Sequence, residues 1–242
     1  MQNDLRENLA EVRQKIKNAA QSVGRSPDEI TLIAVSKTHP PEVLRRAIAA
    51  GAGVFGENKV QEAELKILEI GRESAKWHLI GHLQSNKARK AVQMFDVIQT
   101  LDSLELAGRL ERICAEEKRP ELSVLVQVDL AGEATKSGIS ERELPDLVDF
   151  LQTCKSLKFD GLMILPPFFE DVEKVRPFFR QLREIRDRLA RQNAFTNRKG
   201  ELSMGMSHDF ETAIEEGATL VRVGTAIFGE RIKAPLGADR RM

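Results

Sequence analysis

A lysine at the end of a short apolar segment is the residue with the clearest chemical potential in this chain. Lys37 follows the apolar residues 32–35, with only Ser36 between them. Lysine is rarely placed inside a protein unless it is paired or functional. Desolvation lowers the pKa of an amine, and a neutral amine condenses with an aldehyde or a ketone. The alternative interpretation is a side chain that extends from the strand end to solvent.

Two stretches late in the chain have the composition of a phosphate site. Residues 202–207 read Leu-Ser-Met-Gly-Met-Ser, and residues 222–229 read Arg-Val-Gly-Thr-Ala-Ile-Phe-Gly. Backbone N–H groups at a helix start bind phosphate, glycine permits close approach, and hydroxyls donate further hydrogen bonds. The candidate contacts are Ser203, Met204, Gly205, Ser207, Gly224 and Thr225. The competing interpretation makes Ser207 an N-cap for a helix over 208–216 and the glycines simple turn residues.

Arg222 lies within an apolar segment, where its permanently charged guanidinium must find an acceptor. Two partners are open: the carboxylate of Asp129, or a ring nitrogen of a bound cofactor. His78 and His82 differ by four positions but flank Gly81, so they do not share a helical face as zinc ligands would. We therefore expect no metal site.

The periodicity of apolar residues predicts the elements that position these side chains. Apolar residues at 5, 9, 12, 16, 19, 20 and 23 predict a helix over 3–23. Short apolar runs then alternate with helical patterns. The runs, read as strands, are 31–35, 53–55, 77–80, 96–98, 123–128, 159–165, 202–204 and 220–223. The helices are expected near 41–50, 58–70, 85–94, 103–117, 140–154, 173–192 and 208–216, with a short one after Thr225.

This alternation predicts an α/β fold, a single (β/α)₈ TIM barrel with an extra N-terminal helix. Apolar strands joined by helical crossovers are typical of a parallel sheet covered on both faces, and barrels of about 250 residues are common. We expect the barrel domain over 1–232 and a polar, mobile tail over 233–242. An open doubly wound sheet is the rival fold. Against it, Ser-Lys-Thr-His-Pro-Pro follows the first strand instead of Gly-x-Gly-x-x-Gly.

In such a barrel, side chains that do chemistry lie at the carboxyl ends of the strands. The residues expected there are Lys37, Glu57, Asn58, His82, Asp102, Asp129, Pro166, Ser203, Gly205, Arg222, Gly224 and Thr225. So many polar groups at one rim indicate a binding site. Asn58 either caps the helix that follows it or hydrogen-bonds a ligand, and spacing does not separate these roles.

The composition excludes several classes of function. The chain has 242 residues, with 37 Lys and Arg against 37 Asp and Glu, so we expect no extended grip on nucleic acid or an anionic membrane. Two cysteines make no disulfide framework, and no apolar run is long enough to span a bilayer, so we expect a cytoplasmic protein. The chain has no tyrosine, which excludes a tyrosine general acid or base from this polypeptide.

Several motifs together carry a family resemblance that runs from about residue 5 to 232. They are Ala-Val-Ser-Lys at 34–37, Phe-Gly-Glu-Asn at 55–58 with Gln61 and Glu62, Trp-His-Leu-Ile-Gly-His-Leu-Gln-Ser-Asn-Lys at 77–87, Gly-Glu-Ala-Thr-Lys-Ser-Gly at 132–138, Gly-Leu-Met at 161–163, and the two stretches at 202–207 and 222–229. In these motifs the sequence resembles the pyridoxal phosphate homeostasis protein family. The barrel of that family is similar to the N-terminal domain of bacterial alanine racemase and to eukaryotic ornithine decarboxylase.

The resemblance implies a Schiff base between Lys37 and the aldehyde of pyridoxal 5′-phosphate. It also implies that the 203–207 loop, Gly224 and Thr225 hold the phosphate. Arg222 would face the pyridine nitrogen, and Asn58 and His82 would line the site. The implied function is a carrier without catalytic residues that buffers or delivers the cofactor, as a monomer or weak dimer in transient contact with apo-enzymes that use pyridoxal phosphate.

Two enzymatic alternatives and one mechanistic one remain. A protonated Arg222 leaves the ring nitrogen unprotonated and makes the ring a poorer electron sink, so a weak amino-acid racemase is the first rival. Alanine racemases, however, use a tyrosine as second base and carry an extra β-rich domain. The second rival is a Schiff-base aldolase acting on a phosphorylated sugar. Lys136, in the loop over 132–138, is a candidate to accept the cofactor by amine exchange, unless it is only a solvated or phosphate-attracting lysine.

Overall fold

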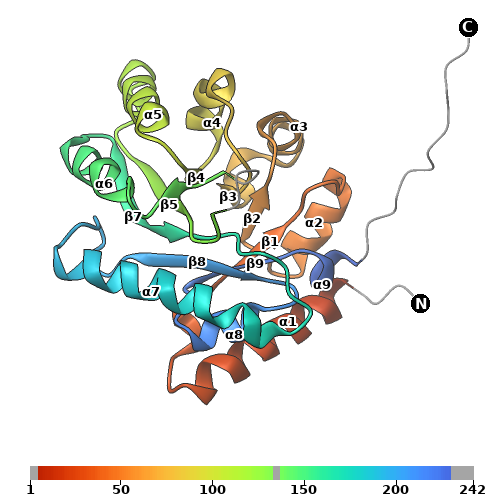
Figure 1. Ribbon diagram of the computed structural model, residues 1–242. Helices are drawn as coiled ribbons and strands as arrows, with labels where there is room; N and C mark the ends of the chain where they lie inside the picture. The colour runs from red at the N-terminus through yellow and green to blue at the C-terminus, as the bar shows by residue number, and fades with distance from the viewer. Residues whose placement is uncertain (1–4, 133–136, 230–242) are drawn as a thin grey trace, which may run out of the picture.

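A closed parallel barrel forms the centre of the molecule (Figure 1). The computed structural model describes residues 5–132 and 137–229. The barrel strands are β1 (Thr31–Val35), β2 (Val54–Glu57), β3 (Lys76–Leu79), β4 (Val97–Leu101), β5 (Leu122–Asp129), β7 (Leu157–Met163), β8 (Glu201–Met206) and β9 (Leu220–Val223). Strand β4 pairs with β5 and β1 pairs with β9, both parallel, so the sheet closes on itself. The predicted barrel is confirmed, and an open sheet is excluded by these two pairings.

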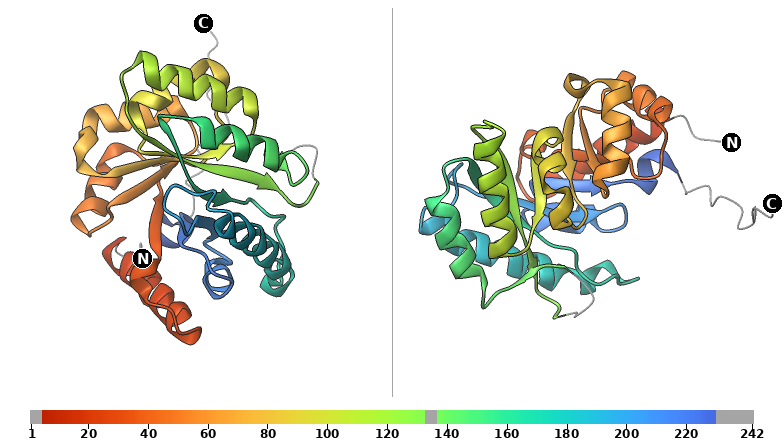
Figure 2. Two further views of the ribbon diagram at one scale, coloured as in Figure 1. Left: turned by 90° about the vertical axis from the view of Figure 1, so that its left-hand side faces the viewer. Right: turned by 90° about the horizontal axis from the view of Figure 1, so that it is seen from above.

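Helices cover the outside of the barrel, as the turned views in Figure 2 show. They are α2 (Pro41–Ala49), α3 (Val60–Ile70), α4 (Ala88–Met94), α5 (Leu104–Glu116), α6 (Leu144–Thr153), α7 (Arg176–Arg191), α8 (Phe210–Glu215) and α9 (Thr225–Phe228). The additional N-terminal helix, α1 (Leu5–Ser22), packs against α8 and α9. Its buried stripe includes Leu9, Val12 and Ile16, which recur at the helical spacing that the sequence predicts.

One strand of the structure is not predicted by the sequence pattern. The two-residue strand β6 (Ile139–Ser140) pairs with the end of β5, where the sequence pattern predicts the start of a helix at 140. Gly138, just before it, has φ +145°, and a Cβ there would lie 2.9 Å from the backbone nitrogen of Asp129. A pairing this short leaves no periodic signal in the sequence. The predicted tail over 233–242 lies outside the described residues.

The strands separate an outer apolar layer from a small inner one. The outer layer lies between strands and helices and includes Phe55, Trp77 and Leu79. The inner cluster consists of Ile33, Leu125, Met163 and Leu220, with Val54, Val97 and Leu165 packed against it. Because side chains alternate along a strand, each residue is assigned to one layer by its position relative to these apolar neighbours.

A line of hydrogen-bonded polar side chains also lies inside the barrel. Nη1 of Arg222 donates to Oγ of Ser203 (2.6 Å), and that hydroxyl donates to Oε1 of Gln99 (2.7 Å). Nε2 of Gln99 contacts Nδ1 of His78 at 2.8 Å. All four side chains are buried. Burial lowers the pKa of His78 from 6.5 to about 4, while Asp96 opposes this shift and Lys76 adds to it. The imidazole is therefore neutral at pH 7, and Nδ1 accepts a hydrogen bond from Gln99.

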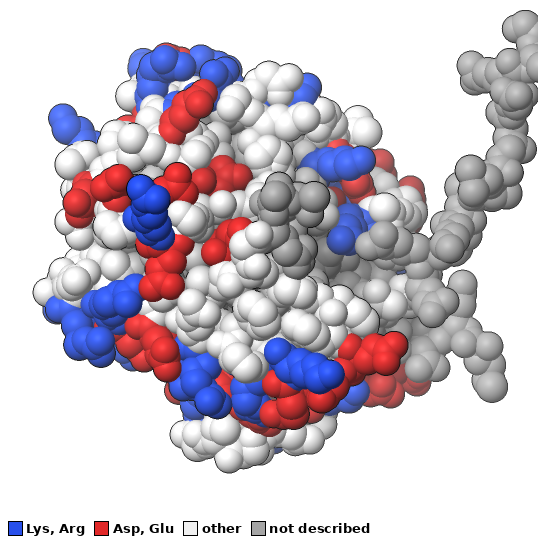
Figure 3. Space-filling model, viewed as in Figure 1, with Lys and Arg blue, Asp and Glu red and all other residues white. Residues whose placement is uncertain are grey.

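The charged surface is mixed in sign. On the face drawn in Figure 3, Lys and Arg side chains lie beside Asp and Glu side chains. Between α7 and α8, for example, Arg176 pairs with Glu173 and with Glu215, at 2.7 Å each. None of the helices within 5–132 and 137–229 combines the length and apolar character that crossing a bilayer requires.

We predict that His78 makes the fold acid-sensitive between pH 6.5 and about 4. In this interval the unfolded chain binds a proton that the folded chain excludes, so the stabilisation is complete above pH 6.5 and declines as the pH falls. The full loss is roughly 3 kcal/mol in the free energy of unfolding. Urea denaturation of the wild type and of His78→Gln, whose amide oxygen still accepts from Gln99, measures it. Equal losses in the two proteins would contradict the prediction.

Candidate functional site

The predicted site residues come from five strands that are neighbours around the barrel. The order β8, β9, β1, β2, β3 is continuous in the sheet. Lys37 follows β1, Asn58 follows β2 and His82 follows β3. Ser203 and Gly205 lie in β8, Ser207 follows it, Arg222 lies in β9, and Gly224 and Thr225 follow that strand. Because all these strands are parallel, their carboxyl ends form one arc of the rim.

Lys37 lies just after β1, at the carboxyl end of the strand. Ile33 lies in the inner cluster, so Val35, two residues on at the end of β1, has the same orientation. Ser36 is fully buried on the opposite side, where its hydroxyl donates to Oε1 of Glu57 (2.6 Å). Lys37 lies in the turn that follows and is half-buried. The lysine after the apolar strand is therefore part of the rim.

The ends of β8 and β9 join to form a cluster of hydrogen-bond donors close to β1. The backbone N–H of Gly224 donates to Oγ of Ser207 (3.2 Å), and Thr225 beside it is exposed. A Cβ on Gly224 would lie 3.3 Å from the carbonyl oxygen of Val35, so this strand end lies directly against that of β1. The competing N-cap role of Ser207 is wrong, because Asp209 occupies the N-cap position of α8.

Gly205 permits the irregularity near the end of β8 that places this cluster. Its φ of +91° lies in the left-handed region, and a Cβ there would lie 2.6 Å from the Cβ of Ala213 on α8. At the end of the strand, the backbone N–H of Met206 donates to Oδ1 of Asp209 (2.6 Å). Burial raises the pKa of Asp209, and this hydrogen bond and the charge of Arg222 oppose the shift.

Arg222 is a buried cation whose partners are neutral. Its Nη1 donates to Ser203 and its Nη2 donates to the carbonyl oxygen of Ile164 (2.8 Å). Burial lowers its pKa to about 10, against the effect of Asp209, so it stays charged at neutral pH. Asp129, the partner proposed from the sequence, instead accepts from the backbone N–H groups of Ala131 and Gly132, at 3.0 Å each. Within the described residues, Arg222 has no ion pair.

Asn58 and His82 flank the arc on the side of β3. Gly81 packs on the backbone of Asn58 so closely that a Cβ would lie 2.3 Å from its carbonyl oxygen. The N-cap position of α3 is occupied by Lys59, which removes the capping role considered for Asn58. Nδ1 of His82 lies 3.3 Å from Oδ2 of Asp102 and 3.1 Å from Oγ of Ser137. His82 is exposed, so it can reach a ligand at the rim.

Two predicted phosphate contacts are turned away from this cluster. Ser203 is fully buried, and its hydroxyl joins Arg222 to Gln99 inside the barrel. Met204 is fully buried in the outer apolar layer. The geometry thus leaves Ser207, Gly224 and Thr225 as the exposed or half-buried members of the predicted set. Lys136, the predicted relay, lies outside the described residues.

Sequence reasoning missed a buried ionic cluster behind Lys37. Lys66 on α3 pairs with Glu57 (2.6 Å) and with Glu62 (2.7 Å), and Glu57 points away from the barrel mouth where we expected it. A signal was present in the sequence, because Lys66 is three residues after Ala63 on the buried face of α3. A lysine on an apolar helical face needs a buried acceptor.

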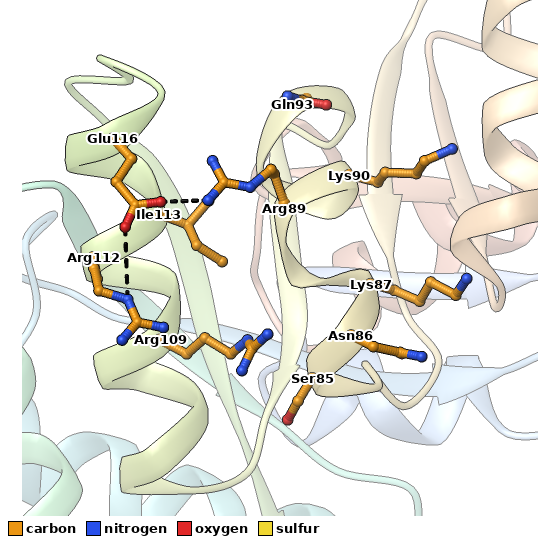
Figure 4. A pocket seen from close by; sticks show the side chains of 10 residues that line it. All are labelled: Ser85, Asn86, Lys87, Arg89, Lys90, Gln93, Arg109, Arg112, Ile113 and Glu116. Atoms are coloured by element: carbon orange, nitrogen blue, oxygen red, sulfur yellow. Dashed lines mark hydrogen bonds and ion pairs between the residues drawn. The ribbon is translucent and has the colours of Figure 1, made fainter.

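A hollow of about 460 Å³ lies between α4 and α5, outside the strands (Figure 4). Its lining is mainly basic, and Arg89 and Arg112 both pair with Glu116 there. None of the ten side chains that line this hollow belongs to the predicted site. The rim, not this hollow, holds the lysine, the arginine and the hydroxyl groups together.

Comparison with known proteins gives a consistent result across almost the whole chain. Residues 5–232 match the sequence model of the family described as alanine racemase, N-terminal domain. A pyridoxal phosphate homeostasis protein of Escherichia coli strain K12 is 44% identical over 238 residues, which span 95% of this chain and 97% of that protein. A protein of the same name from Aquifex aeolicus is 41% identical over 225 residues, spanning 93% and 97%.

Solved structures agree with the sequence comparison. PipY of Synechococcus elongatus, solved with PLP bound, superposes with a TM-score of 0.79 at 40% identity, and the match covers 93% of this chain and all of that one (100%). Alanine racemase of Corynebacterium glutamicum shares the fold, with a TM-score of 0.64 at 18% identity, over 96% of this chain and 64% of its own. The sequence relatives and the shared barrel together establish that this chain belongs to the pyridoxal phosphate homeostasis protein family.

Proposed function

We propose that this protein holds pyridoxal 5′-phosphate as a Schiff base on Lys37 and buffers or delivers it, without efficient turnover of its own. The observation that carries the proposal is the contact between the ends of β1 and β9. It places Lys37 on the same arc as Arg222, Gly224 and Thr225. The names of the relatives and the PLP bound to PipY support the choice of ligand.

The donor set fits this ligand. The exposed end of the arc offers the hydroxyl of Ser207, the backbone of Gly224 and the hydroxyl of Thr225, which suit a phosphate group. The nearby carboxylate of Asp209 is engaged by the N–H of Met206 and not by this cluster. Glycine at 224 leaves the rim open beside β1, where a side chain would approach Val35. Asn58 and His82 are placed to line the ring edge from the β2 and β3 side.

Lys37 supplies the reactive amine. In its neutral form, Nζ of Lys37 would add to the aldehyde carbon, a C=N bond would form, and the carbonyl oxygen would leave as water. The bound cofactor supplies an electron sink for amino-acid chemistry when its ring nitrogen is protonated. The residues around Lys37 determine whether that capacity is used.

Arg222 argues against transamination and decarboxylation, which need a strong electron sink. It is charged at neutral pH and buried at the base of the site, so a ring nitrogen facing it remains unprotonated and the ring is a weak electron sink. The absence of tyrosine from the sequence removes the second base that alanine racemases use. We therefore propose a carrier that passes the cofactor to apo-enzymes. Incorporation of solvent deuterium at Cα of alanine would contradict this part of the proposal.

Borohydride reduction tests the role of Lys37. Reduction fixes the Schiff base, so after digestion the pyridoxyl mass is expected on the peptide that contains Lys37, because this amine faces the rim. Lys37→Ala is expected to lose the label. Lys66, on the opposite side of the strands, is an internal control and should remain unlabelled. Recovery of most of the label on another lysine would overturn the assignment.

A second substitution tests the phosphate cluster. Thr225→Ala removes one hydroxyl donor to a charged group. This loss corresponds to an increase of about tenfold in the dissociation constant for pyridoxal phosphate. Unphosphorylated pyridoxal should be affected less. Thr153→Ala, which removes an exposed hydroxyl at the C-terminal end of α6, is the matched control. Equal losses for the two ligands would show that the phosphate is bound elsewhere.

A further inference from the structure

A buried ammonium group lies behind the proposed cofactor lysine, on the outer side of β1 and β2. Lys66 has only 4% of its surface exposed. Its Nζ donates to the carbonyl oxygen of Ser36 (2.7 Å), to Oε1 of Glu57 (2.6 Å) and to Oε1 of Glu62 (2.7 Å). An ammonium group has three N–H donors, so each has an acceptor. The cluster joins α3 to the ends of two strands.

The same cluster holds the backbone on both sides of Lys37. Before it, the cluster binds Ser36 at two points, its carbonyl oxygen by Lys66 and its hydroxyl by Glu57, in addition to the backbone bonds of Ser36 with Gly56 and His39. After it, the backbone N–H of Thr38 donates to Oε1 of Glu62. Glu57 and Glu62 are both bound by Lys66. One ammonium group thus organises the two peptide units that flank the reactive lysine.

The turn that presents Lys37 is strained. Thr38 has φ +69°, in the left-handed region. Threonine is β-branched, and such a residue adopts this conformation only when its surroundings enforce it. The hydrogen bond from Thr38 to Glu62 opposes relaxation of this turn, together with the bond from the backbone N–H of His39 to the carbonyl oxygen of Ser36 (3.1 Å). Without it, the backbone after Ser36 would gain access to other conformations.

A buried ionic cluster between a helix and a sheet carries a cost in desolvation free energy. Burial raises the pKa of Glu57, against the charge and hydrogen bond of Lys66, and its Oε2 has no hydrogen-bond partner within the described residues. Burial would also raise the pKa of Glu62, but the hydrogen bonds from Lys66 and Thr38 outweigh it, so the pKa is lowered. Apolar side chains would pack here at lower cost. What the charges add is a fixed geometry for the turn.

We propose that Lys66, acting through Glu57 and Glu62, is the positioning residue for Lys37 and sets how readily that lysine forms and keeps its covalent link to the cofactor. This inference rests on the proposed function. Lys66 does not react itself, because its Nζ is buried and is saturated by three acceptors. Its influence on the cofactor passes through the backbone of Ser36 and Thr38.

The test compares two probes that differ only at the reacting carbon. Pyridoxal phosphate forms the covalent link, whereas pyridoxine 5′-phosphate has the same ring and phosphate but no aldehyde. In full-length Lys66→Met, misplacement of Lys37 should reduce the affinity for pyridoxal phosphate about tenfold or more. It should also slow the appearance of visible absorbance on mixing, while binding of pyridoxine phosphate stays unchanged. Lys17→Met, which removes an exposed lysine on α1, is the control and should alter neither.

The outcomes are separable. An equal loss of affinity for both probes would show that Lys66 only supports the fold. No change in the affinity for either probe would show that Lys66 does not position Lys37. Either result overturns the inference. If Lys66→Met does not fold, Glu62→Ala, which releases only Thr38 and one contact of Lys66, carries the same test with a smaller expected loss. A wild-type protein that forms no link at Lys37 would instead overturn the proposed function.

Discussion

Closure of the barrel by its first and last strands is the constraint on which the site depends. Strand β1 pairs with β9 from Thr31 opposite Leu220 through Ala34 opposite Val223. The next residue of β9 is a glycine that lies against the carbonyl of Val35. The amine near the start of the chain and the donors near its end therefore share one rim. A shift of one residue in this register would turn either Lys37 or Arg222 to the wrong side of the sheet.

The strand alternation then divides the polar residues into two systems with different tasks. Inside the barrel, Arg222 is linked through Ser203 and Gln99 to the neutral His78, so a buried cation is held without a carboxylate. Outside, the Lys66 cluster fixes the turn behind Lys37. Buried polar groups are costly when they lack partners, so each system constrains the geometry of the residue at its end. Lys37 follows β1 and Arg222 lies in the neighbouring strand β9, so the two systems end next to each other at the rim.

Much of this arrangement is predictable from sequence because the strands end where polarity begins. The patterns at 31–35 and 220–223 match β1 and β9 residue for residue. Parallel strands then bring Lys37, Asn58, Gly224 and Thr225 to one rim.

The sequence pattern alone does not determine the direction of each polar contact. The hydroxyl of Ser203, a candidate phosphate donor by its sequence position, is used inside the barrel. Asp129 was one candidate partner of Arg222, yet it closes its own turn. Such contacts depend on three-dimensional packing.

A single reactive amine linked to a phosphate site is the central proposal for this protein, and a spectroscopic titration tests it most directly. Pyridoxal phosphate is added to the wild-type protein and the visible absorbance is recorded until it saturates. We expect a yellow protein that saturates at one cofactor per chain, with a much weaker response to unphosphorylated pyridoxal. A protein that stays colourless, or that takes up cofactor without saturation as scattered surface lysines would, contradicts it.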